Sequence, residues 1–98
     1  MRVVFARPAD APERLVATAR ILFDEDPGPF WNVALTGIEI WRPREGDLDV
    51  VLPRRSGSED EEDLRLIESA SGDPVHLDTL RAWILREFTR EQVFRKAA

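Results

Sequence analysis

The sequence has no cysteine, no tyrosine and a single histidine among its 98 residues. Without cysteine the chain forms no disulfide, no thiolate metal site and no cysteine nucleophile. No apolar run approaches the roughly 20 residues of a membrane-spanning helix. The first residues are too short an apolar stretch for a secretory signal. We therefore expect a cytoplasmic protein with no membrane partner.

Motifs for catalysis and for cofactor binding are also lacking. The five glycines are scattered, so no glycine-rich loop is available to hold a phosphate group. His76 has no second histidine near it, and Asp73, which shares its helical turn, adds too few ligands for a metal site. We expect His76 to be a surface residue at the start of a helix. The sequence predicts no catalytic residue, no metal and no cofactor, and hence a protein that is not an enzyme.

What the chain has in excess is acid, and the acid is concentrated in one segment. Lys and Arg number 14 and Asp and Glu number 19, a formal net charge of −5. Residues 56–79 carry one basic and eight acidic groups, whereas residues 80–98 carry five basic and two acidic groups. Nucleic-acid-binding domains usually carry a net positive charge. Because the excess of acidic residues in this chain is confined to one segment, it does not exclude a local basic surface elsewhere.

Hydrophobic alternation predicts four strands, over residues 3–6, 15–24, 31–41 and 48–52. In the third, the apolar residues change parity on either side of Gly37. A β-bulge at this glycine would re-aim the side chains that follow it. Turn residues separate the strands, so consecutive strands should pair antiparallel.

The second half of the chain is predicted to hold a loop, a short strand and a helix. An acidic loop spans about residues 54–63, and residues 64–67 are predicted as an edge strand. Asp73 is a good N-cap and Pro74 suits the first helical position. The apolar residues then recur at helical spacing, at Leu77, Leu80, Ile84 and Phe88. The expected fold is α+β, an antiparallel meander of four to five strands with a C-terminal amphipathic helix packed on one face, in a single domain over residues 1–98.

Arginines supply the candidate binding residues. Arg54 and Arg55 follow a strand and a proline. Their two adjacent guanidinium groups could bind phosphates, or the two residues could belong to an ordinary solvated turn. Arg86 lies on the polar side of the expected helix. Arg81 projects among apolar residues, where it could snorkel or could pair with a carboxylate at a subunit interface. The helix dipole accounts for the last basic residues of the chain without a ligand.

Two further features each have an ordinary and a specific interpretation. The acidic run 59–63 lacks the alternating ligands of a calcium loop. It is interpreted as a solvated loop, or as a charged segment that keeps a sheet edge from pairing with another chain. Trp83 suits the core. Trp31 and Trp41 share a parity, and one of them could be exposed at an interface with a partner.

The order of these elements resembles the stage V sporulation protein G family of septation regulators over about residues 2–90. The resemblance is carried by the alanine-rich strand 15–24, the aromatic-led strand 31–41, the strand 48–52 with its Pro53-Arg54-Arg55 ending, and the apolar spacing of the helix. It implies a small dimeric regulator that binds DNA or RNA. By this resemblance the basic pair carries over to Arg54 and Arg55, and the helix basics carry over loosely to Arg81 and Arg86.

The chain departs from the family pattern after the basic pair, where the acidic run 59–63 stands. An alternative is therefore a protein–protein interaction module of the same fold, without the nucleic-acid surface, whose acidic segment attracts a basic partner. In either case a small sheet with open edges favours pairing of two subunits into a homodimer.

Overall fold

The computed structural model describes residues 1–24, 28–55 and 64–97 of the chain. These residues divide into two compact units, Met1–Val51 and Leu52–Ala98. Each unit is described by itself below. That the whole chain forms one domain stays a prediction.

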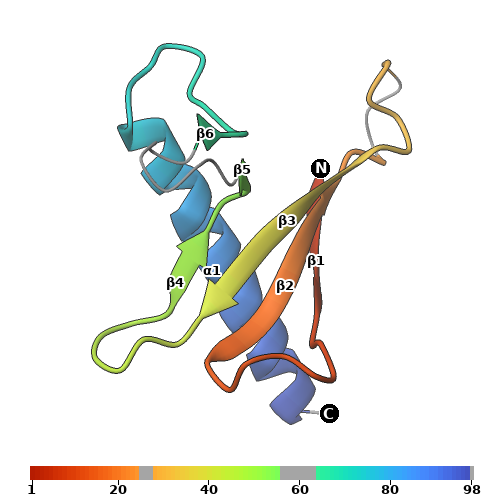
Figure 1. The fold of residues 1–98 in the computed structure, drawn as a ribbon. Coiled ribbons are helices and arrows are strands. Elements are labelled where there is room, and N and C mark those ends of the chain that lie inside the picture. Colours follow the sequence, from red (N-terminus) through yellow and green to blue (C-terminus); the bar gives the residue numbers. More distant parts are fainter. Residues whose placement is uncertain (25–27, 56–63, 98) are drawn as a thin grey trace. The chain divides into compact units, whose positions relative to one another are not determined.

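The first unit is a four-stranded antiparallel sheet. Its strands are β1 (Arg2–Ala6), β2 (Leu15–Leu22), β3 (Ala34–Trp41) and β4 (Asp49–Val51). They lie side by side in sequence order, each paired with the next (Figure 1). With the C-terminal helix described below, this sheet confirms the α+β class and the antiparallel meander.

One face of this sheet holds the core of the first unit. On β2 the buried residues alternate with half-buried or exposed ones, as a strand with one buried face requires. The small alanines and the branched isoleucines share this inner face through the β2–β3 register, in which Ala19 is the partner of Ile38. The buried side chains of the unit are Ala17, Ala19, Ile21, Ile38, Ile40 and Val50.

A β-bulge interrupts β3 at the predicted place. Ala19 pairs with Ile38 and Ile21 pairs with Leu35, so β3 has one residue more than β2 across this stretch. Gly37 lies inside it with a φ of 87°, a region that glycine enters without steric cost. The extra residue is what shifts the apolar parity along β3. The bulge predicted at Gly37 is confirmed.

The third strand begins three residues later than its sequence predicts. Residues 31–33 form turns instead, in which the Trp31 N–H donates to the Gly28 carbonyl at 3.0 Å and the Val33 N–H to the Phe30 carbonyl at 3.1 Å. Asn32 has a φ of 61°, a left-handed conformation that asparagine tolerates better than most residues. The aromatic residues at this point therefore belong to the connection between β2 and β3, not to β3.

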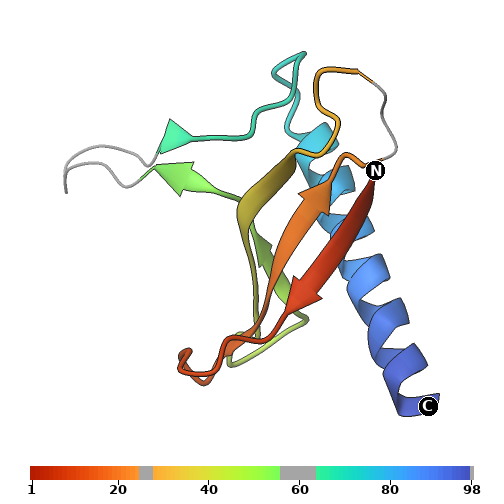
Figure 2. The same ribbon diagram turned by 90° about the vertical axis from the view of Figure 1, so that its right-hand side faces the viewer.

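The second unit holds a short hairpin and the helix. Strands β5 (Arg54–Arg55) and β6 (Leu64–Arg65) pair antiparallel, and α1 spans Val75–Ala97 as one uninterrupted helix (Figure 2). The Val75 N–H donates to Asp73 Oδ1 at 3.0 Å, which confirms Asp73 as the N-cap. Among the described residues, no helix combines the length and the apolar character needed to cross a membrane.

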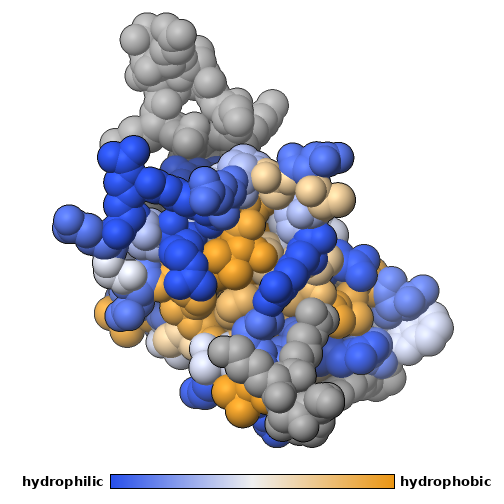
Figure 3. Space-filling view, turned by 90° about the horizontal axis from the view of Figure 1, so that it is seen from below, coloured by the Kyte–Doolittle hydropathy of each residue, from blue (hydrophilic) through white to orange (hydrophobic). Residues whose placement is uncertain are grey.

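Most of the apolar residues predicted to form one side of α1 are the buried ones. Leu77, Ile84 and Phe88 are buried and Leu80 is half-buried, whereas Arg86 and Arg90 are exposed. On the face seen in Figure 3, hydrophobic residues remain visible among hydrophilic ones. The large hydrophobic side chains that are exposed in the described part of the chain are Met1, Phe30, Trp31, Val33, Leu66, Val75 and Val93.

Candidate nucleic-acid interface

The basic pair Arg54–Arg55 forms a strand, and its prediction as part of a loop is wrong. β5 pairs with β6, and the ladder continues where the Leu66 N–H donates to the Pro53 carbonyl at 3.1 Å. The physical reason lies in Pro53. A proline lacks an N–H but keeps its carbonyl acceptor, so Pro53 ends β4 without preventing a second pairing immediately after it.

The register of this hairpin places arginine positions directly opposite one another. Arg54 is the Cα partner of Arg65, and Arg55 is the partner of Leu64. Three arginines therefore occupy four positions of the hairpin. Guanidinium groups bind phosphate oxygens in a bidentate manner, so neighbouring arginine positions are candidates for contact with an anion.

Arg65 is the candidate binding residue that the sequence did not single out. It lies in the segment predicted as an edge strand, but its partner could not be identified from spacing alone. The signal that identifies it is the pairing of β6 with β5. The basic hairpin, defined here as Arg54, Arg55 and Arg65, brings three arginine positions together through its register.

Arg81, on α1, has a different environment from the basic hairpin. Its side chain is 29% exposed and its Nη1 donates to Asp78 Oδ1 at 3.0 Å, one helical turn earlier. At 100° per residue Arg81 lies about 20° from Phe88 and about 40° from Leu77 around the helix, beside its buried residues. The partly buried side chain fits the interpretation of a stem on apolar surface, and pairing with a carboxylate at a subunit interface stays a prediction. The carboxylate that it meets belongs to its own helix.

Arg86 is an exposed residue of α1, and Arg90 follows it on the same face one turn later. Figure 2 shows the hairpin and α1 set apart, with the segment 66–74 connecting them. The four arginines singled out from the sequence therefore do not form one cluster. Arg54 and Arg55 share the hairpin, and Arg81 and Arg86 point to different sides of the helix.

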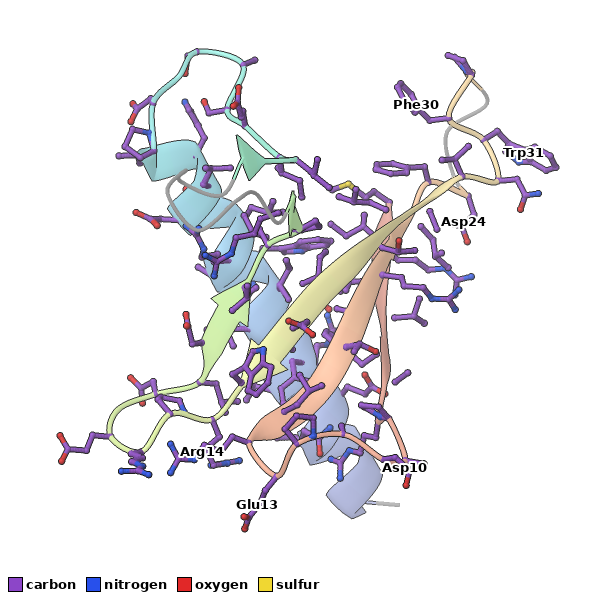
Figure 4. All side chains as sticks on the ribbon, in the orientation of Figure 1. Asp10, Glu13, Arg14, Asp24, Phe30 and Trp31 are labelled. Carbon is purple, nitrogen blue, oxygen red and sulfur yellow. The ribbon has the colours of Figure 1, made fainter. Side chains whose placement is uncertain are left out.

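Other candidates from the sequence lie elsewhere. The acidic run 59–63 falls outside the described residues, as does any partner contact through it. His76 is exposed, and no group of three or more potential metal ligands occurs among the residues that the structure describes. Trp31 is 62% exposed and points away from Phe30 at the end of the β2–β3 connection (Figure 4).

Trp41 and Trp83 are both half-buried, and the Trp41 indole Nε1 donates to Glu39 Oε1 at 3.3 Å. Of Trp31 and Trp41, the two tryptophans that share a parity in the sequence, Trp31 is therefore the exposed residue.

Comparisons of the chain with protein-family models, with curated proteins and with solved structures find no match. The resemblance to the stage V sporulation protein G family therefore remains an expectation from the sequence.

Proposed function

We propose that this chain is a cytoplasmic, non-enzymatic regulatory protein of the stage V sporulation protein G type, which binds DNA or RNA as a homodimer. The observation that carries the proposal is the register of the basic hairpin, with Arg54 opposite Arg65. Two neighbouring phosphates of a nucleic-acid backbone are the anions that such a pair fits. The hairpin would hold the backbone without reading base sequence, since phosphate contacts position a protein and base contacts specify its site.

The overall charge of −5 weakens the proposed contact without excluding it. Interactions between exposed charges fade beyond a Debye length, about 8 Å at physiological ionic strength. The three arginines of the hairpin attract a phosphate backbone at this range. The acidic run 59–63 joins the two strands of the hairpin, and Asp63 is two residues from Arg65, so its charge lowers the affinity for the same ligand. Weak, strongly salt-dependent binding is the behaviour that this combination predicts.

The proposal is tested by fluorescence anisotropy with labelled single-stranded DNA, single-stranded RNA and duplex DNA at several salt concentrations. The variant is Arg54→Ala combined with Arg65→Ala, and the matched control is Arg44→Ala, an exposed arginine of the other unit. We expect the double variant to bind roughly tenfold more weakly than wild type at low salt and to lose about 1.5 from the slope of log affinity against log salt. The Arg44→Ala control should match wild type.

Two results would overturn the proposal. One is an absence of binding by the wild-type protein to all three oligonucleotides at low salt and roughly tens of micromolar protein, the weak end of non-specific binding. The other is equal affinity of the double variant and the control. The first result would favour the alternative, an interaction module whose acidic segment, residues 56–79, attracts a basic protein partner through its eight acidic groups.

A further inference from the structure

Exposed hydrophobic side chains gather in the connection between β2 and β3. Phe30 is 58% exposed, Trp31 62% and Val33 45%, so three of the seven large hydrophobic residues exposed in the described part of the chain lie within four consecutive positions. Single exposed hydrophobic residues are ordinary on a protein surface, whereas contiguous groups of them mark sites of interaction. We call Phe30 and Trp31 the aromatic tip.

The aromatic tip is supported by contacts within its own connection. The Phe23 N–H donates to the Val33 carbonyl at 3.1 Å, which closes the connection at its base. The Phe30 ring packs on the Phe23 ring, with the ring centroids 5.9 Å apart. The two backbone turns described above, with Asn32 at a φ of 61°, hold the residues on either side of Trp31. A segment that is ordered before binding loses less conformational entropy when a partner arrives.

Trp31 is the side chain that the tip presents to a partner. Figure 4 shows Trp31 and Phe30 pointing in different directions, and it is the Phe30 ring that contacts Phe23. The face of an aromatic ring attracts a cation, most strongly when the ring is that of tryptophan, and arginine is the more frequent cation. The exposed indole is therefore suited to a guanidinium group as well as to apolar contact.

The charge of the connection has the sign that a cationic partner requires. Residues 23–33 contain three acidic residues and no basic one. The first of them, Asp24, meets Arg2 Nε through its Oδ2 at 2.7 Å, so Arg2 balances one of the three charges. The next cation, Arg20, lies within β2 opposite Val4, in the sheet and not in the connection. Two acidic charges of the segment are left over, and they attract a cation and repel a phosphate group.

We propose that the aromatic tip is a docking surface for a basic, arginine-bearing segment of a partner protein. A guanidinium group of the segment lies on the Trp31 ring, and the apolar stems of its side chains cover Phe30 and Val33. A single-stranded nucleic acid would also offer flat bases to the ring, but its phosphates would enter the field of the acidic residues. The basic segment is the occupant for which the ring and the charge agree.

This surface goes beyond the proposed nucleic-acid function, because the aromatic tip belongs to the first unit and the basic hairpin to the second. It also differs from the alternative of an interaction module, in which residues 56–79 attract the basic partner. The experiment therefore has to separate binding at the tip from binding at the acidic run 59–63.

The test measures the affinity of a labelled nona-arginine peptide by fluorescence anisotropy. The parent protein is the full chain with residues 59–63 replaced by their amide counterparts, so that this run does not hold the peptide. Trp31→Leu keeps an apolar side chain without a ring and should bind about fivefold more weakly than the parent, whereas Trp31→Phe should lose only about twofold. The control Val93→Ala shortens an equally exposed apolar side chain of the other unit and should bind as the parent does.

Three results would contradict this inference. Equal affinity of Trp31→Leu and the parent would show that the peptide is held elsewhere, and equal losses in Trp31→Leu and Trp31→Phe would show that the ring is not what binds. An oligothymidylate that binds more tightly than the peptide, and is lost in Trp31→Leu, would assign the tip to single-stranded nucleic acid. Binding by the basic hairpin is measured with its own arginine variants, so the two proposals fail independently.

Discussion

Gly37 determines which side chains of β3 reach the core. Before the bulge Leu35 shares the inner face with Ile21, and after it Ile38 and Ile40 do so, although they differ from Leu35 in parity. The sequence contains this information, because the parity change and the glycine coincide. A bulge could thus be predicted without knowing which strand would lie beside it.

Replacing Gly37 should destabilise the protein through its backbone conformation. A β-branched residue at a φ of 87° places its Cβ against the neighbouring carbonyl, at a cost of about 1–2 kcal/mol. We expect Gly37→Val to lower the free energy of unfolding in urea by at least this amount, and Gly37→Asn to lower it less. Thr36→Val, one residue earlier, is the control and should stay within about 0.5 kcal/mol of wild type. Equal losses for Gly37→Val and Thr36→Val would contradict the role assigned to the glycine.

Arg81 shows where residue-level prediction reaches its limit. Its position among apolar residues of the helix could be inferred from spacing, and that inference matches its 29% side-chain exposure. The identity of its partner could not, because spacing along the helix does not show which carboxylate the guanidinium reaches. In the structure that carboxylate is Asp78, one turn earlier, at 3.0 Å.

At the scale of elements, the length of the periodic pattern decides what can be predicted. β2 and α1 contain enough alternating or helically spaced residues to be recognised. The hairpin β5–β6 has two residues in each strand, too few for any periodicity, and the proline before it predicts a break. Its pairing depends on contacts between residues far apart in sequence, such as Arg54 and Arg65, which no local pattern reports. The candidate site could therefore be predicted only in part: its first two arginines, but not the third.

The helix start gives a prediction at this scale. The Val75 N–H would lack an acceptor within the helix, and Asp73 Oδ1 supplies one at 3.0 Å. Asp73→Ala should lower the free energy of unfolding by about 1 kcal/mol, measured by urea denaturation followed by circular dichroism. Asp73→Ser keeps an acceptor oxygen and should retain most of that stability. A full loss in the serine variant would indicate that the charge, through the helix dipole, matters more than the hydrogen bond.

At the scale of the whole molecule, charge is unevenly divided between the two units. Residues 1–51 hold six basic and nine acidic groups, and residues 52–98 hold eight and ten. The second unit thus contains both the basic hairpin and the acidic run that connects its strands. Opposite charges this near in sequence act on the same ligand, so the affinity for a polyanion is a balance between them.

That balance is open to measurement by neutralising residues 59–63 with their amide counterparts, Asp to Asn and Glu to Gln. Removing five negative charges near the hairpin should raise oligonucleotide affinity roughly tenfold at low salt. The gain should shrink as salt shortens the Debye length from about 30 Å at 0.01 M to about 8 Å at 0.15 M. Glu45→Gln with Asp47→Asn, in the other unit, is the control and should change affinity little. If the hairpin is the binding element, adding Arg54→Ala and Arg65→Ala to the neutralised protein abolishes most of the gain. A gain that survives those two substitutions would place the binding surface elsewhere on the chain.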